Sequence, residues 1–139
     1  MSENILLVGS GAREHSIAKA IDRSTNLNDM FCLASNMNPG IASLCKEFIV
    51  DDFNNPETVS SYATKNNISM AVIGPENPLQ NGVVDSLWNL GVGVVGPKKD
   101  LAQIETSKTF TRNLLKKHNI PGGPKYKTFK SLDGVKGFL

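Results

Sequence analysis

The segment with the clearest potential for chemistry runs from Gly9 to His15 and reads Gly-Ser-Gly-Ala-Arg-Glu-His. Its two glycines, Gly9 and Gly11, allow a sharp backbone turn and a close approach to a ligand. If a helix follows, its N-terminus offers backbone N–H groups and the positive end of a dipole, which favour a phosphate. Arg13 could pair with the same phosphate. The segment therefore predicts a phosphate-binding turn.

The same segment is close to the Gly-x-Gly-x-x-Gly pattern of dinucleotide-binding domains, but Glu14 stands in place of the third glycine. The acidic residue that contacts the ribose about 20 residues further on is also missing. A dinucleotide-dependent oxidoreductase is therefore disfavoured, although it stays open as an alternative. A tight turn without a ligand also stays open, with Arg13 in solvent and His15 as a packing or capping residue.

Three further loops rich in glycine, proline or asparagine each follow an apolar run. They are Asn36–Gly40, Gly74–Leu79 and Gly96–Pro97. In open parallel sheets, ligands bind outside the carboxyl ends of the strands. We therefore expect these loops and the first turn to form one site, in which Glu76 could orient a hydroxyl or an amine. Each Gly-Pro pair could also be a simple turn, and Glu76 could cap a helix.

Five short apolar runs predict the strands that must position these loops. The runs predict buried strands at Ile5–Val8, Met30–Ala34, Phe48–Val50, Met70–Ile73 and Val92–Val95. Segments with helical periodicity separate several of them, including a helix that starts at Asn55–Glu57 and one whose apolar face includes Trp88. Strands that alternate with helices imply parallel pairing and right-handed crossovers. The fold class is therefore α/β, with an open parallel sheet in three layers.

The last third of the chain differs in charge and pattern. Residues 1–95 carry five basic and ten acidic side chains, whereas residues 96–139 carry ten basic and three acidic ones. Such a shift indicates two segments with different uses, or simply a lysine-rich surface. Thr106 could cap a helix, Lys125–Phe129 alternates like an exposed strand, and a final helix from Ser131 has too few turns to be stable alone. We expect the chain to be part of a longer protein.

Composition excludes several classes of protein. Of the 139 residues, 40% are hydrophobic and 20% are charged, which suits a packed core, and the net charge of +2 does not indicate nucleic-acid binding. No apolar run approaches the roughly 20 residues of a membrane helix. The acidic N-terminus is unlike a signal peptide. Two cysteines, Cys32 in a core strand and Cys45 in a packing position, provide neither a disulfide framework nor a zinc site. We expect a cytoplasmic protein without nucleic-acid or membrane partners.

Three motifs taken together are specific for one family. They are Leu7–His15, Gly74–Leu79, and Gly96–Pro97 followed by Ala102–Lys108. With them the chain resembles the N-terminal part of the phosphoribosylamine–glycine ligases, also called glycinamide ribonucleotide synthetases. Asn38–Gly40 resembles the form that the loop after the second strand has in archaeal members of this family. These enzymes are ATP-grasp ligases of de novo purine synthesis. They join 5-phosphoribosylamine and glycine through a glycyl phosphate, using ATP and magnesium.

The resemblance implies a division of the chain and a set of site residues. Residues 1–104 would be the Rossmann-like domain that precedes the ATP-grasp fold, and residues 105–139 would begin the ATP-grasp region, with Lys108 near the ATP phosphates. The residues expected to bind the phosphoribosylamine are Gly9, Ser10, Gly11, Arg13, Glu14, His15, Asn38, Gly40, Gly74, Pro75 and Glu76. Catalytic residues and magnesium ligands are expected in sequence absent here, so the chain alone would be inactive.

The chain departs from the family's usual sequence in three places, Ala12, Lys98–Leu101 and Gly122–Gly123. A third function, that of a noncatalytic α/β domain used for association, also stays open. The oligomeric state does not follow from the sequence.

Overall fold

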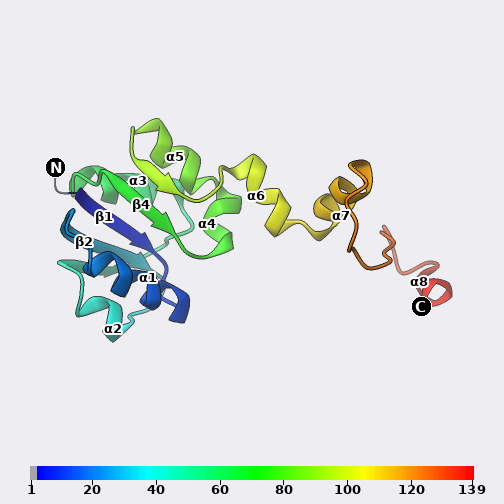
Figure 1. The fold of residues 1–139 in the computed structure, drawn as a ribbon, viewed down its shortest axis with the longest axis horizontal. Coiled ribbons are helices and arrows are strands. Elements are labelled where there is room, and N and C mark those ends of the chain that lie inside the picture. The colour runs from blue at the N-terminus through cyan, green and yellow to red at the C-terminus, as the bar shows by residue number, and fades with distance from the viewer. Residues whose placement is uncertain (1–2) are drawn as a thin grey trace. The chain divides into compact units, whose positions relative to one another are not determined.

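A computed structural model describes residues 3–139 of the chain. The chain forms two compact units, Met1–Ala102 and Gln103–Leu139, and each is described here by itself. The first unit contains the whole sheet and the second contains only helices and loops (Figure 1). The α/β fold class expected from the sequence is confirmed for the first unit.

The sheet of the first unit has five parallel strands. The strands are β1 Glu3–Val8, β2 Leu27–Ala34, β3 Glu47–Val50, β4 Met70–Ile73 and β5 Gly93–Val95. Their order across the sheet is β3-β2-β1-β4-β5, so β1 lies in the centre. In register, Leu7 of β1 lies between Cys32 of β2 and Val72 of β4. All five predicted strands are present.

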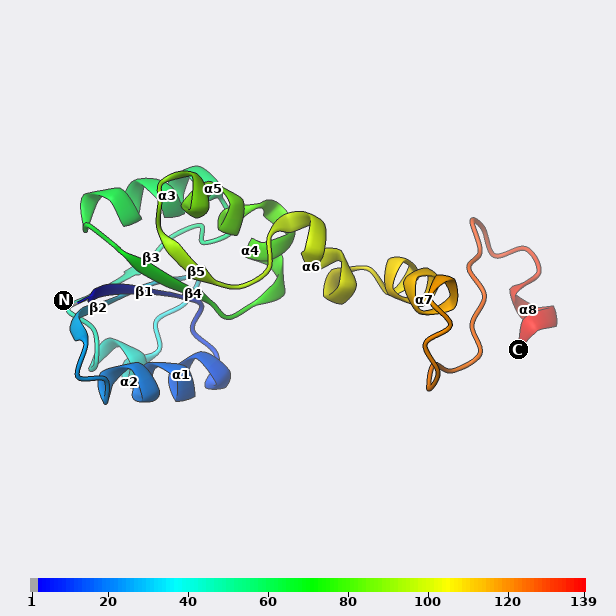
Figure 2. The same cartoon turned by 45° about the horizontal axis from the view of Figure 1, so that its top comes forward.

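Helices cover both faces of this sheet, as Figure 2 shows. The helices of the first unit are α1 Ala12–Asp22, α2 Pro39–Ala42, α3 Pro56–Lys65, α4 Glu76–Asn81 and α5 Val83–Asn89. Because side chains alternate along a strand, Leu6 and Val8 pack toward α3 and α5, and Leu7 packs toward α1 and α2. The predicted three-layer arrangement is therefore confirmed, with one apolar cluster on each face.

Local sequence explains where two of these helices begin. Asn55 caps α3, because its side-chain oxygen accepts hydrogen bonds from the backbone N–H groups of Glu57 at 2.9 Å and Thr58 at 3.4 Å. Pro56 at the first helical position needs no such partner. The helix start predicted at Asn55–Glu57 is confirmed. Asn38 and Pro39 begin α2 in the same way.

Two predictions for the first unit are wrong in detail. Strand β2 begins at Leu27 rather than Met30, because its polar first residues pair with β1 and the register extends to Glu3. The sequence predicts Trp88 on the apolar face of its helix, which would bury it, but it is 49% exposed at the end of α5. The ammonium group of Lys98 lies 5.2 Å from the centre of its ring, and this cation–π contact accounts for an aromatic side chain at the surface.

The second unit differs more from its prediction. Helix α6, Lys99–Thr106, contains the boundary between the two units, and the second unit also has α7 Lys108–Lys117 and the short α8 Val135–Phe138. Ser107 rather than Thr106 caps α7, because its hydroxyl accepts a hydrogen bond from the backbone N–H of Phe110 at 3.2 Å. The predicted strand at residues 125–129 is wrong, since these residues form a loop without a strand beside it in the described part of this unit.

Candidate functional site

The centre of the sheet contains a topological switch point. From β1 the chain builds β2 and β3 on one side, and it then crosses to build β4 and β5 on the other. In open α/β sheets, ligands bind outside the carboxyl ends of the strands at such a point. The loops that follow β1 and β4 therefore frame the candidate site. Their backbones are joined directly, because the N–H of Gly74 donates to the carbonyl of Val8 at 3.0 Å.

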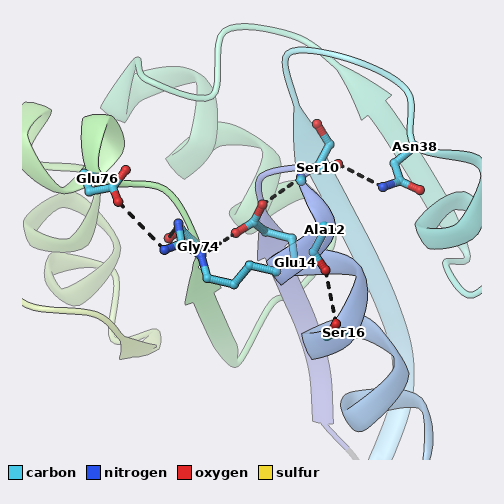
Figure 3. A network of polar contacts seen from close by, with 9 residues as sticks. Ser10, Ala12, Glu14, Ser16, Asn38, Gly74 and Glu76 are labelled. Atoms are coloured by element: carbon cyan, nitrogen blue, oxygen red, sulfur yellow. Dashed lines mark hydrogen bonds and ion pairs between the residues drawn. The ribbon is translucent and has the colours of Figure 1, made fainter.

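Glu14, in the first turn of α1, fills the space between these two loops (Figure 3). Only 4% of its surface is exposed, and it is the one charged residue in the core of the described part of the chain, residues 3–139. Its Oε2 accepts a hydrogen bond from the backbone N–H of Gly11 at 2.7 Å, and its Oε1 accepts one from Nε of Arg13 at 3.0 Å. Both carboxylate oxygens are thus satisfied inside the protein.

Three glycines surround the Glu14 side chain. A Cβ atom at Gly9 would lie 3.0 Å from the Glu14 Cγ, and one at Gly11 would lie 2.7 Å from its Oε2. At Gly74 a Cβ would overlap the carboxylate. These distances are shorter than packed atoms tolerate. Glu14 thus occupies the space into which a side chain at these glycines would extend, and the predicted contact of Gly9 and Gly11 with a ligand stays a prediction. Gly9 is also required by its positive φ of 116°.

Arg13 spans the switch point from the outside. Besides Glu14, its guanidinium donates to the carbonyl of Gly74, and its Nη1 lies 3.8 Å from Oε1 of Glu76. The Arg13 side chain is 54% exposed and that of Glu76 is 49% exposed. A positive group fixed at several points, with half of its surface in solvent, is suited to pair with an anionic ligand.

The loop after β2 is attached to the same cluster through Asn38. Its amide nitrogen donates to the carbonyl of Ser10 at 2.9 Å, while its side-chain oxygen accepts from the backbone N–H of Gly40 at 3.0 Å. A Cβ at Gly40 would overlap the imidazole ring of His15. His15 therefore packs against α2, and Gly40 leaves room for its ring.

The structure thus brings the predicted residues of three loops together at one edge of the sheet. Pro75 takes part through its ring, which would lie 2.8 Å from a Cβ at Gly9. The fourth loop is different, because Gly96 packs against Leu79 of α4, which would lie 3.2 Å from its Cβ. Gly9 and Glu14 are buried and His15, Gly40 and Gly74 are partly buried, whereas Arg13 and Glu76 present charged groups to solvent.

Lys108 lies in the second unit, at the start of α7. It borders a cavity of about 220 Å³ lined by Lys108, Thr109, Arg112, Tyr126, Lys127 and Thr128. Sequence reasoning missed Arg112 and Lys127 as neighbours of Lys108. The spacing of four residues between Lys108 and Arg112 could have indicated the first, because residues at that spacing share a helix face. No group of three possible metal-binding side chains gathers within residues 3–139.

The two cysteines lie beneath the glycine turn. The thiol of Cys32 is buried and donates to the carbonyl of Gly9 at 3.4 Å. The neighbouring Cys45 thiol raises the pKa of the Cys32 thiol, and burial raises it further. The neighbouring Cys32 thiol lowers the pKa of Cys45, which is only partly buried. Cys32 is thus the thiol that keeps its proton.

We expect iodoacetamide to alkylate Cys45 at least tenfold faster than Cys32 in the folded chain, because the thiolate is the reactive form and Cys32 is fully buried. Peptide mass spectrometry over a time course measures both rates. In a denaturant the two rates should become similar. Equal rates in the folded chain would contradict the pairing of the two thiols.

Comparison with known proteins gives one family. The model of the family described as "Phosphoribosylglycinamide synthetase, N domain" matches residues 3–105. The phosphoribosylamine–glycine ligase of Methanosarcina barkeri is 47% identical over 125 residues, which is 90% of this chain and 29% of that protein. The enzyme of the same name from Methanocaldococcus jannaschii is 48% identical over 126 residues, 91% of this chain and 28% of that protein. The chain therefore spans less than a third of the length of these relatives.

Solved structures share the fold at low sequence identity. The phosphoribosylglycinamide synthetase of Anaerococcus prevotii matches with a TM-score of 0.68 and 17% identity, over 99% of this chain and 34% of that one. The N5-carboxyaminoimidazole ribonucleotide synthetase of Thermotoga maritima matches with a TM-score of 0.72 and 20% identity, over 99% and 36%. Among the described residues, no helix has the length and apolar character needed to cross a membrane. Since the family model covers most of the chain, the protein belongs to the family of phosphoribosylglycinamide synthetase N domains.

Proposed function

We propose that this chain is the N-terminal part of an ATP-dependent ligase that joins 5-phosphoribosylamine and glycine to form glycinamide ribonucleotide in purine biosynthesis. The observation that carries the proposal is the 47% identity to a phosphoribosylamine–glycine ligase over 90% of the chain. The two cysteine thiols suit a reducing cytoplasm, where we place the enzyme. Because the chain covers about 30% of such relatives, we expect no turnover from these 139 residues alone.

In this proposal the switch-point site holds the phosphoribosylamine. Arg13, whose side chain is 54% exposed, would pair with the phosphate through its guanidinium, since that group matches the geometry of phosphate oxygens. The Glu76 carboxylate would accept hydrogen bonds from ribose hydroxyls or from the amine. Ser10 and Gly11 belong to the turn before α1, which Glu14 and Asn38 hold in place through hydrogen bonds, while His15 packs against Gly40.

The second unit would contribute to ATP binding. The three cations Lys108, Arg112 and Lys127 border one cavity, and their charges fit a polyphosphate. ATP, when bound, would supply the phosphoryl group that activates the glycine carboxylate. In this chain Lys108 would hold phosphate oxygens in place.

Thermal unfolding tests the substrate assignment against the dinucleotide alternative. A ligand at 100 times its dissociation constant stabilises a protein by about 2.7 kcal/mol. We expect the Tm of the 139-residue chain to rise with millimolar ribose 5-phosphate and to stay constant with NAD or NADP. A rise with NAD and none with ribose 5-phosphate would overturn the proposal.

The role of Lys108 is tested in a full-length ligase that contains residues 1–139. We expect Lys108→Ala to raise the KM for ATP roughly 10- to 100-fold, the effect of losing one or two hydrogen bonds to a charged group, and to leave the KM for phosphoribosylamine nearly unchanged. The assay is ADP release that depends on both glycine and phosphoribosylamine. Lys116→Ala is the matched control, because Lys116 lies on the same helix and does not border the cavity. Equal effects of the two substitutions would contradict the assignment.

A further inference from the structure

The position of Glu14 has a consequence for ligand selection. In dinucleotide-binding domains the second glycine of the pattern lets a pyrophosphate approach the backbone, and the third glycine lets helix and strand pack closely. Here the second glycine is Gly11, and its N–H already donates to the Glu14 carboxylate at 2.7 Å. Glu14 itself occupies the position of the third glycine. The Glu14 side chain therefore removes both the free backbone N–H at the second glycine and the small third residue that a dinucleotide-binding turn requires.

We infer that Glu14 is a selectivity residue that closes the β1–α1 turn to the pyrophosphate of a dinucleotide. A phosphate that approached Gly11 would meet a negative charge on the group that already holds the Gly11 N–H. Because Glu14 is 4% exposed, solvent and salt screen this repulsion only weakly. The carboxylate also satisfies the positive end of the α1 dipole, which otherwise attracts an anion.

The packing of Glu14 keeps this closure in place. Its side chain fills the space left by Gly9, Gly11 and Gly74, and both of its oxygens are bonded. The hydrogen bond from Arg13 adds a second effect, because it holds the guanidinium over the switch point from outside. A sugar monophosphate can pair with Arg13 there, whereas a dinucleotide needs the backbone that Glu14 covers. The identity of the sugar monophosphate rests on the proposed function, whereas the exclusion of a dinucleotide does not.

The test restores the missing glycine. Glu14→Gly completes the Gly-x-Gly-x-x-Gly pattern from Gly9 onward, and ADP-ribose is the probe, titrated into the 139-residue chain by calorimetry. We expect the dissociation constant for ADP-ribose to fall at least tenfold in the variant. Glu57→Gly is the matched control, since Glu57 is an exposed acid in the first turn of α3, and it should leave ADP-ribose binding unchanged. A folded Glu14→Gly variant without this gain would overturn the inference.

A second variant decides the matter if Glu14→Gly does not fold. Glu14→Gln keeps the shape and an oxygen for the Gly11 N–H but removes the charge. We expect it to bind inorganic pyrophosphate at least threefold more tightly than the unchanged chain, and an unchanged affinity would overturn the inference. A purely structural role would lower stability without raising either affinity. If ADP-ribose binding rises while ribose 5-phosphate binds to neither form, the inference stands and the proposed function fails.

Discussion

Replacing Arg13 by alanine is expected to weaken the binding of ribose 5-phosphate to this chain roughly 10- to 100-fold, because hydrogen bonds to charged groups contribute about 1.5–3 kcal/mol. Arg13 is the cation whose guanidinium is held by groups from both loops of the switch point, the Glu14 carboxylate and the Gly74 carbonyl, while half of its side chain faces solvent. Titration calorimetry at constant ionic strength measures the change.

The control for this prediction is Arg23→Ala. Arg23 lies at the C-terminal end of α1, so its replacement removes the same charge from the same helix at the end remote from the site. We expect its effect on the affinity to be less than twofold. Equal losses for the two variants would mean that Arg13 acts only through the net charge of the chain, and the assigned contact with phosphate would then be wrong.

Substituting Gly74 by alanine should lower the free energy of unfolding by about 3 kcal/mol. The new Cβ would overlap the Glu14 carboxylate, and overpacking together with a disturbed buried hydrogen bond has a cost of this size. Urea denaturation followed by circular dichroism measures the change. Gly93→Ala is the matched control on β5, because its Cβ would lie 3.7 Å from the nearest backbone oxygen, an ordinary contact.

A double-mutant cycle identifies the partner in this clash. With Glu14→Ala in the background, the carboxylate is gone, and Gly74→Ala should cost less than about 1 kcal/mol. An unchanged cost in that background would show that another group restricts residue 74. Glu14 would then not be the reason for the glycine.

The strands were predictable because each is a short apolar run, and the layers followed because helices separate the strands. The order of the strands was not predictable in this way. That β1 lies between β2 and β4 depends on contacts between residues far apart in the sequence, such as the pairing of Leu7 with both Cys32 and Val72. This order creates the switch point, so the sequence located the loops but not their arrangement around it.

The candidate site shows a similar division. The sequence identified the residue types, but it did not show that Glu14 packs against Gly9, Gly11 and Gly74, because no local pattern indicates that its side chain turns inward between the loops after β1 and β4. The exposed position of Trp88 was missed for a related reason. Its helical spacing fits the apolar face of α5, and only the structure shows that this end of the helix extends beyond the core.

The most direct test of the central claim, that the switch point binds a sugar phosphate, is a titration of the nitrogen-15-labelled chain with ribose 5-phosphate, followed by amide chemical shifts in NMR. We predict saturable shifts that concentrate at residues 9–13 and at Gly74 and Glu76, and their loss in Arg13→Ala. Saturable shifts confined to α3, to α5 or to the second unit, or no shifts at millimolar ligand, would contradict the account.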